Sequence, residues 1–252
     1  ADQILSVRPA PSPDVDFEYV IHNADGGEVE HCGNGARCFV RFVHDQGLSQ
    51  RNPLRVKVKK GVIELALRPD GSVRVDMGAP VWAPEHVPFD TQGLTASNLG
   101  NLARWPLSVP GGEVMASVVS MGNPHVVMVV DDVDNAPVAA VGAALERHAR
   151  FPERVNVGFL QVLTPHEVRL RVFERGAGET LACGTGACAA VVCGIRWGLL
   201  QGPVRVQTHG GPLEIDWQDN ALHNAPVIMS GPATFGSVST DGSVLVACAP
   251  IS

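Results

Sequence analysis

Apolar and polar residues of this 252-residue chain alternate in short runs, which are separated by turns rich in glycine, asparagine and aspartate. Alternation with a period of two is typical of strands that bury one face. It predicts strands at 3–7, 16–22, 54–58, 62–67, 73–77, 113–120, 126–130, 156–163, 167–174, 204–208, 213–217 and 227–230. The stretch 78–112 is rich in proline, glycine, asparagine and serine, and we expect mostly loops and a crossover there.

Helical spacing occurs in three places. After Cys32, residues Ala36, Phe39, Val40 and Val43 follow the i, i+3, i+4, i+7 rule of a helix with one buried face. The segment that follows Cys183 is apolar almost all round, so we expect it to be buried on every side. Residues 135–148 form the third predicted helix.

Two of these helices begin in copies of one motif. Gly27–Ala36 and Gly178–Ala187 both read G-E-x-x-x-C-G-[N/T]-G-A, and the two cysteines are 183 − 32 = 151 residues apart. Further on, the sequence at Pro53 (P-L-R-V) matches the sequence at Pro203 (P-V-R-V), with an offset of 203 − 53 = 150. Chance similarity between glycine-rich turns is the alternative explanation.

The repeat predicts an α+β fold of two similar domains, each a mostly antiparallel sheet wrapped around a central helix. We expect the domains at 1–112 and 113–230, with 231–252 as a segment that could return to the first domain. Clefts between domains are preferred places for binding sites, so we expect the active site there.

Composition narrows the class of protein. With 19 Lys and Arg against 26 Asp and Glu, the formal net charge is −7, which argues against nucleic-acid and anionic-membrane partners. No apolar run approaches the roughly 18 residues of a membrane span, and no charged-then-apolar leader is visible. Six cysteines are too few for a disulfide scaffold of this length, so we expect a soluble protein in the reducing cytoplasm. Their spacings are not those of zinc sites, and no metal is expected.

The two helix starts suggest chemistry. Free backbone N–H groups and the positive end of the helix dipole favour an anion and ease deprotonation of a thiol at Cys32 or Cys183. The glycines allow a ligand to approach, yet neither copy is a nucleotide fingerprint, so a carboxylate is an alternative to a phosphate. Glycines that merely begin a helix tightly would look the same.

A matched pair of cysteines has a specific use. One thiolate can remove a proton from a carbon while one thiol returns a proton to the opposite face, which inverts a stereocentre. We expect Cys32 and Cys183 to face each other for this purpose. The alternatives are a single cysteine nucleophile of a Cys–His enzyme and two structural cysteines. The other four cysteines (Cys38, Cys188, Cys193 and Cys248) are expected to pack as small apolar residues.

Polar residues near the motifs could orient a substrate. His125 follows a Gly-Asn-Pro turn and could tune a thiol, although a histidine on a turn is often only exposed. Arg175 could bind a carboxylate through two hydrogen bonds or form a surface ion pair. Asn156 interrupts a strand pattern, which suggests a buried hydrogen bond or a ligand contact.

Together these residues resemble the diaminopimelate epimerases. The matching motifs, which run through nearly the whole chain, are N-A-D-G at Asn23, C-G-N-G-A-R-C at Cys32, G-N-P-H at Gly122, V-N-V-G-F at Val155, E-R-G-A-G-E-T at Glu174 and A-C-G-T-G at Ala182. The resemblance implies conversion of LL-2,6-diaminopimelate to the meso form for lysine and peptidoglycan synthesis, without pyridoxal phosphate or a metal, in a cytoplasmic homodimer.

The resemblance also assigns roles to residues. Cys32 and Cys183 match the two catalytic bases, and His125 and Glu174 match residues that adjust the pKa values of those bases. Residues at the helix starts match contacts to the reacting carboxylate: Gly33, Asn34, Gly184 and Thr185. Other substrate contacts, several of them to the distal end, are implied at Gln3, Asn23, Asn123, Asn156, Glu174 and Arg175.

The resemblance has limits. The family normally opens with a strand and a Gly-Asn-Asp-Phe-like motif that supplies a substrate asparagine, and nothing in this chain matches it, so we expect either a fragment or an incomplete site. The tail after Phe235 also departs from the family pattern. Two other functions stay open: a proline or hydroxyproline racemase, which would not need Arg175 and the asparagines, and a non-catalytic duplicated domain that binds a small anion.

Overall fold

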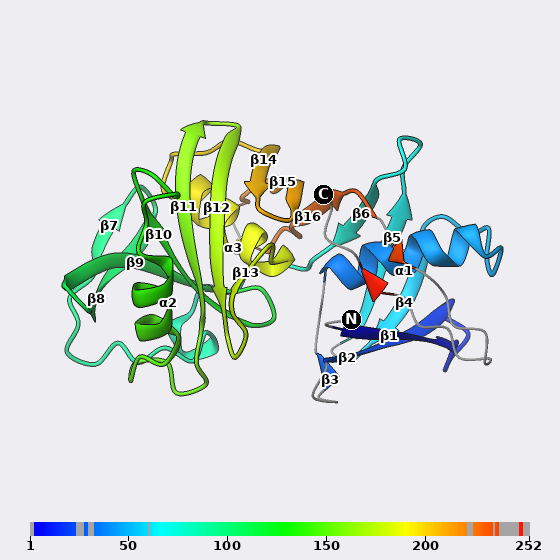
Figure 1. The fold of residues 1–252 in the computed structure, drawn as a ribbon, viewed down its shortest axis with the longest axis horizontal. Helices are drawn as coiled ribbons and strands as arrows, with labels where there is room; N and C mark the ends of the chain where they lie inside the picture. Colours follow the sequence, from blue (N-terminus) through cyan, green and yellow to red (C-terminus); the bar gives the residue numbers. More distant parts are fainter. Residues whose placement is uncertain are drawn as a thin grey trace. The chain divides into compact units, whose positions relative to one another are not determined.

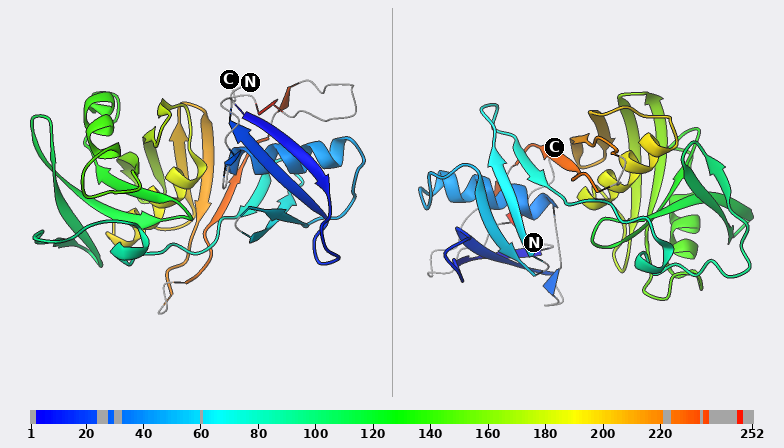
Figure 2. Two further views of the ribbon diagram at one scale, coloured as in Figure 1. Left: turned by 90° about the horizontal axis from the view of Figure 1, so that it is seen from below. Right: turned by 180° about the vertical axis from the view of Figure 1, so that it is seen from behind.

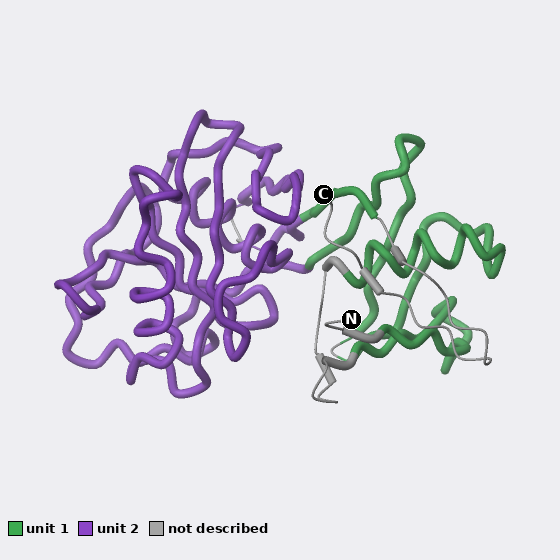
Figure 3. The backbone as a smooth tube through the Cα atoms, in the orientation of Figure 1, with its two compact units in different colours: residues 1–77, 228–252 green, residues 78–227 purple. Residues whose placement is uncertain are grey.

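The computed structural model describes residues 3–23, 28–29, 33–59, 61–220, 224–233, 235–236 and 247–248. It divides into two compact units (Figure 3). Unit 1 combines Ala1–Met77 with Ile228–Ser252, and unit 2 is Gly78–Val227. None of the described helices is long and apolar enough to cross a membrane.

The described residues of unit 1 form a sheet and the helix α1 (Figure 1). Its strands lie in the order β1-β2-β4-β5-β6-β16, and every neighbouring pair is antiparallel except β2 and β4. The elements are β1 (Gln3–Pro9), β2 (Phe17–Asn23), β3 (Glu28–Val29), α1 (Gly33–Asp45), β4 (Leu54–Val58), β5 (Gly61–Leu67), β6 (Val73–Asp76), β16 (Ile228–Gly231), β17 (Phe235–Gly236) and β18 (Ala247–Cys248).

Helix α1 packs through the face that its sequence predicts. Phe39 is fully buried, and its ring centroid lies 5.4 Å from that of Tyr19 on β2. The helix also contacts β1, β5 and β6, as the ribbon shows within this unit (Figure 2). Cys38 on the same helix is buried, but it is disulfide-bonded to a partner outside the described side chains. The expectation that Cys38 packs in the core as a small residue is confirmed, but its sulfur is not a free thiol.

Unit 2 is a larger sheet with the strand order β15-β14-β12-β11-β10-β9-β8-β7, and β13 pairs with β12. The pairs β10–β11 and β12–β14 are parallel. The elements are η1 (Pro84–His86), β7 (Ser97–Leu99), β8 (Leu102–Val109), β9 (Gly112–Ser120), β10 (Pro124–Val129), α2 (Val138–Glu146), β11 (Asn156–Thr164), β12 (Glu167–Glu174), β13 (Gly178–Thr180), α3 (Gly184–Arg196), β14 (Val204–Thr208) and β15 (Gly211–Asp216).

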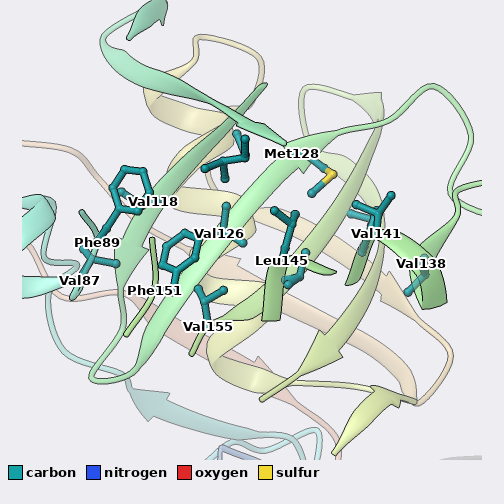
Figure 4. Close-up of a cluster of buried hydrophobic side chains, with 14 of the residues drawn as sticks. Val87, Phe89, Val118, Val126, Met128, Val138, Val141, Leu145, Phe151 and Val155 are labelled. Carbon is teal, nitrogen blue, oxygen red and sulfur yellow. The ribbon is translucent and has the colours of Figure 1, made fainter. Parts of the chain in front are cut away.

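Two helices cover opposite faces of this sheet. Gly142 of α2 packs against Phe173 of β12, where an added Cβ would lie 2.6 Å from the phenylalanine side chain. Gly186 of α3 packs against the neighbouring Val172, where an added Cβ would lie 3.1 Å from the valine side chain. Successive side chains of a strand point to opposite faces, so α2 and α3 lie on different sides of β12. Residues 185–194 of α3 are all buried, as the apolar sequence predicts. On the α2 side the core contains Val126, Leu145, Phe151 and Val155, among others (Figure 4).

The segment 78–112 belongs to unit 2 and not to the first unit, where the sequence placed it. It contains β8, which pairs with β9 from Trp105↔Ala116 to Val109↔Gly112. Leu107 is buried, and Val87 and Phe89 contribute to the core on the α2 side. These apolar contacts attach the segment to the second sheet. Residues 231–252 belong to unit 1, as the alternative of a returning segment proposed.

Strand register shows that the two units contain copies of one fold. The parallel pair Phe17↔Val56 of unit 1 corresponds to Val168↔Val206 of unit 2, with offsets of 168 − 17 = 151 and 206 − 56 = 150. The short strands agree as well: Ile21↔Val29 of β2 and β3 corresponds to Val172↔Thr180 of β12 and β13, 151 residues later. Helices α1 and α3 each have 13 residues. The duplication inferred from the sequence is a structural one.

Candidate functional site

Four chain segments bring their polar residues to one end of the sheet in unit 2. Strand β10 begins beside β11, with His125 paired to Asn156. Strand β12 runs antiparallel to β11, so its last residue, Glu174, lies at the same end. Helix α3 contacts β10, β11 and β12 and begins directly after Cys183. The fold thus gathers residues that are up to 62 positions apart in sequence, as the contact of Asn123 with Thr185 shows.

Cys183 is the N-cap residue of α3. Its backbone is extended, with φ −130° and ψ 114°, and only 7% of the residue is exposed. The sulfur lies 3.5 Å from the Thr185 hydroxyl oxygen, either of which can donate the hydrogen bond. A Cβ on Gly186 would come within 3.2 Å of the Cys183 Cβ and 3.4 Å of its sulfur. A side chain at Gly186 would therefore be crowded by Val172, 3.1 Å away, and by the side chain of Cys183.

Burial decides the charge of this thiol. It raises the pKa of Cys183 well above the ordinary thiol value, and the nearby Glu174 carboxylate raises that pKa further. Hydrogen bonds from Thr185 and from the Gly186 N–H lower it, as a helix start should, but they do not offset burial. The expectation that the helix start makes Cys183 lose its proton easily is wrong in its net effect. In this structure Cys183 is a protonated thiol at neutral pH.

A hydrogen-bond chain connects Cys183 with His125. His125 Nε2 lies 3.0 Å from the Asn123 side-chain oxygen, and Asn123 Nδ2 lies 3.3 Å from the Thr185 hydroxyl. With the amide in this orientation, Asn123 accepts from the His125 Nε2–H and donates to Thr185. Thr185 then keeps its own hydrogen for the sulfur, 3.5 Å away. The chain favours a Cys183 whose sulfur accepts a hydrogen bond, which is what a thiolate requires.

His125 is neutral in the folded protein. Only 1% of the residue is exposed, and burial lowers its pKa from 6.5 to about 3, with a further contribution from the positive charge of Arg175. The alternative of an exposed histidine on a turn is therefore wrong. A neutral imidazole can donate from Nε2 to Asn123 without placing a positive charge beside the thiol.

Asn156 holds two backbone segments together. It is 3% exposed; its Nδ2 donates to the Pro124 carbonyl at 3.0 Å, and its Oδ1 accepts the Arg175 N–H at 3.0 Å. The buried hydrogen bond that the sequence suggested is present. These contacts fix the turn that carries Asn123 and His125 relative to the turn that carries Arg175. A substrate contact of Asn156 stays a prediction.

Glu174 and Arg175 differ in their surroundings. The Glu174 carboxylate accepts a hydrogen bond from the Thr180 hydroxyl at 2.5 Å, and the residue is half-buried. Arg175 is exposed, and its Nη1 donates to the Glu153 carbonyl at 3.1 Å. No carboxylate of the described residues pairs with Arg175, so the surface ion pair that the sequence left open is not seen among them. The sequence analysis did not single out Thr180, which ends the Gly-Glu-Thr segment of the second copy and corresponds to Val29 in the first.

The corresponding positions of unit 1 are described only in part. Cys32 lies outside the described residues. Gly33 and Asn34 begin α1, Asn23 ends β2 and Gln3 begins β1, paired with Asn23. Their roles stay predictions. Among the described residues, no group of three histidine, cysteine, aspartate or glutamate side chains could hold a metal ion.

Comparisons of sequence agree on one family. A sequence profile of the family described as diaminopimelate epimerase matches residues 1–83 and 117–236. A relative from Albidiferax ferrireducens with the name diaminopimelate epimerase is 60% identical over 238 residues, which are 93% of this chain and 81% of the relative. One of the same name from Cupriavidus taiwanensis is 58% identical over 250 residues, 99% of this chain and 85% of the relative.

Solved structures share the fold at much lower identity. A hydroxyproline epimerase from Agrobacterium vitis has a TM-score of 0.64 at 15% identity and covers 99% of this chain and 76% of its own. A PhzF-family phenazine biosynthesis protein from Bacillus anthracis has a TM-score of 0.60 at 13% identity, over 99% and 84% of the two chains. The two-domain α+β fold is thus the fold expected from the repeat.

Proposed function

The chain belongs to the diaminopimelate epimerase family of isomerases, and we propose that it converts LL-2,6-diaminopimelate to the meso isomer by a two-base reaction without a cofactor. Cys32 and Cys183 are the two bases. We place the reaction in lysine and peptidoglycan precursor biosynthesis, as the resemblance of the motifs implies.

The proton balance is simple. One cysteine, as thiolate, takes the α-proton and becomes a thiol, and the electron pair is delocalised into the α-carboxylate. The other cysteine, as thiol, gives its proton to the opposite face of the carbon and becomes a thiolate. The substrate leaves with inverted configuration, and the roles of Cys32 and Cys183 are exchanged for the reverse direction. No atom or electron is required from another reactant.

The helix starts supply the electrostatic part. We assign the reacting carboxylate to the backbone N–H groups at Gly33 and Asn34 of α1 and at Gly184 and Thr185 of α3. Free N–H groups and the helix dipoles stabilise the negative charge that grows on this carboxylate when the α-proton leaves. The charge of Arg175, with the amides of Asn23 and Asn123, is assigned to the distal amino-acid end.

The observation that carries the proposal is the state of Cys183. A thiol that is 7% exposed and kept protonated by burial and by Glu174 is suited to deliver a proton. Its Thr185 hydrogen bond can stabilise the thiolate that remains. The sequence repeat supports Cys32 as the second base, because Cys32 stands 151 residues before Cys183 and directly precedes Gly33, the first residue of α1.

The test is exchange of the α-proton of LL-2,6-diaminopimelate in deuterated buffer with a reducing agent, followed by NMR. The wild type should replace the α-proton with deuterium and form the meso isomer. Cys183→Ser should lower this rate by about a thousandfold or more, because a serine hydroxyl is a far weaker base than a thiolate at neutral pH. Cys188→Ser, which changes a buried cysteine away from the helix start, is the matched control and should leave the rate within about threefold.

Two outcomes would contradict the proposal. Exchange that survives both Cys32→Ser and Cys183→Ser would remove the cysteines from the reaction. Turnover of L-proline, with none of diaminopimelate, would favour the racemase alternative, which has no use for the distal contacts around Arg175.

We further propose a cytoplasmic homodimer, which rests on the resemblance alone. Sedimentation velocity of the reduced protein should give twice the monomer mass, and the calculated mass of the chain is 26.6 kDa. A single species at the monomer mass across micromolar concentrations, with full activity, would contradict the dimer.

A further inference from the structure

Glu146, the last residue of α2, is a buried carboxylate that the reaction does not use. Only 2% of the residue is exposed. Its Oε1 accepts the Gly176 N–H at 3.0 Å and lies 3.4 Å from Arg154 Nη1, and its Oε2 lies 3.0 Å from Arg147 Nε. A buried charge is costly unless hydrogen bonds and opposite charges satisfy it, and here both oxygens have partners.

The partners of Glu146 differ in what they can contribute. The side chains of Arg147 and Arg154 are 74% and 52% exposed, so water competes for these ion pairs and each adds little. The Gly176 N–H, in contrast, is a backbone donor in a turn, where φ is +77°. The contact that gives the Glu146 carboxylate a specific structural role is therefore its hydrogen bond with the Gly176 N–H of this turn.

The turn that Glu146 holds carries the proposed substrate contacts. Gly176 follows Glu174 and Arg175 directly, and the Arg175 N–H is bound to Asn156 at 3.0 Å. The backbone oxygen of Glu146 also accepts the Val155 N–H at 3.3 Å, next to Asn156. One residue at the end of α2 thus fixes both segments from which these polar groups project.

We propose that Glu146 is a positioning residue for substrate binding: it holds the Glu174–Gly176 turn so that the Arg175 guanidinium is placed for a carboxylate at the distal end of the substrate. The inference rests on the proposed function. The Glu174 carboxylate is held separately by the Thr180 hydroxyl, so loss of the Glu146–Gly176 bond displaces mainly Arg175 and weakens binding in the ground state and the transition state alike. Such a loss raises KM and leaves kcat nearly unchanged.

Two conservative substitutions separate the length of the Glu146 side chain, which the hydrogen bond to Gly176 requires, from its negative charge. Glu146→Asp keeps the negative charge for both arginines, but it withdraws the carboxylate by one methylene from Gly176. Glu146→Gln keeps the length and an acceptor oxygen for Gly176, but it removes the charge. We expect KM for LL-2,6-diaminopimelate to rise about tenfold in Glu146→Asp, the loss typical of one buried hydrogen bond, with kcat within about threefold. Glu146→Gln should keep KM within about threefold of the wild type.

Arg147→Ala is the matched control, because it removes a partner of the same carboxylate that does not touch the turn. It should change neither KM nor kcat by more than about threefold. Thermal denaturation of all three variants shows whether each is folded at the assay temperature.

The inference is overturned if Glu146→Asp leaves KM unchanged, or if kcat falls as much as kcat/KM. It is also overturned if KM rises more in Glu146→Gln than in Glu146→Asp, because the negative charge, and not the hydrogen bond to Gly176, would then be what matters. Failure of the proposed function looks different: the wild type itself would then exchange no α-proton of diaminopimelate.

Discussion

Buried His125 should make the protein sensitive to mild acid. Its folded-state pKa is about 3, lowered mainly by burial, whereas in the unfolded chain it is expected at 6.5. Between these values the unfolded chain binds a proton that the folded protein does not. Stability therefore rises with pH in this window; the contribution of His125 is fully present above about pH 6.5 and is lost as the pH falls toward 3.

The size of the effect follows from the two pKa values. Their difference, 6.5 − 3 = 3.5, corresponds to about 5 kcal/mol at the acid end of the window. At pH 5 the loss is about 2 kcal/mol, since the unfolded state gains about 1.4 kcal/mol for each pH unit below 6.5. For a unit of about 150 residues this lowers the melting temperature by about 4–8 °C.

The assay compares the wild type with His125→Gln at several pH values between 5 and 7.5. Glutamine does not titrate, and its amide can still donate to Asn123, so the variant should show a shallower fall of melting temperature toward pH 5. His148 also has a lowered pKa, caused by burial and then by Arg150, and it contributes with the same sign in both proteins. The difference between the two curves therefore isolates His125.

An independent measurement is NMR of the imidazole groups in the folded protein. The His125 resonances should not move between pH 7.5 and 4.5. Titration of this ring with a midpoint near 6.5, or identical acid slopes for wild type and His125→Gln, would refute the claim that the ring is buried and neutral.

Two further predictions concern the surroundings of Cys183. Thr185→Val removes the hydroxyl 3.5 Å from the sulfur, and with it a hydrogen bond that lowers the pKa of Cys183. Alkylation of Cys183 at pH 8, followed by peptide mass spectrometry, should therefore slow about fivefold, whereas Thr185→Ser should react at the wild-type rate. Equal rates for the valine and serine variants would contradict the hydrogen bond. Gly186→Ala should lower kcat about tenfold, because the added Cβ would lie 3.1 Å from Val172 and 3.2 Å from the Cys183 Cβ and would displace the cysteine side chain. Gly158→Ala, whose Cβ has room at 3.6 Å, should leave kcat unchanged, and equal kcat values for both variants would contradict the crowding.

Most strands could be predicted because their side chains alternate between a buried and an exposed face. Strand β4 shows this pattern in the structure, with Leu54, Val56 and Val58 buried, and its bounds agree with the prediction. Strand β8 was missed because its sequence, L-A-R-W-P-L-S-V, does not alternate and contains Pro106. Proline also misled the prediction at Pro9: β1 lies at the edge of its sheet, where a missing N–H does no harm, and the strand continues to that residue.

The residues that gather at one end of the sheet could be named from the sequence, but their protonation could not. The repeated motif and the family resemblance pointed to Cys183, Thr185 and His125 without any knowledge of burial. The sequence could not show that burial raises the pKa of Cys183 and lowers that of His125, because burial depends on neighbours far along the chain. Glu146 was missed for the same reason: a glutamate near the end of an amphipathic helix is usually solvated, and only the position of the Gly176 turn shows why this one is buried.

The sequence repeat gives Cys32 and Cys183 equivalent positions along the chain, and we expect divergence between the copies to make the two thiols unequal. The strand register equates Asn23 with Glu174 at the ends of β2 and β12, and the same offset of 151 equates Asn34 with Thr185. A carboxylate beside Cys183 raises its pKa, whereas the equivalent asparagine carries no charge that could do the same for Cys32. A two-base inversion needs one protonated and one deprotonated thiol before each turnover. Burial is the largest cause of the raised Cys183 pKa and the Glu174 charge comes second, so we expect Glu174→Gln to lower the pKa of Cys183 only in part and to remove neither base.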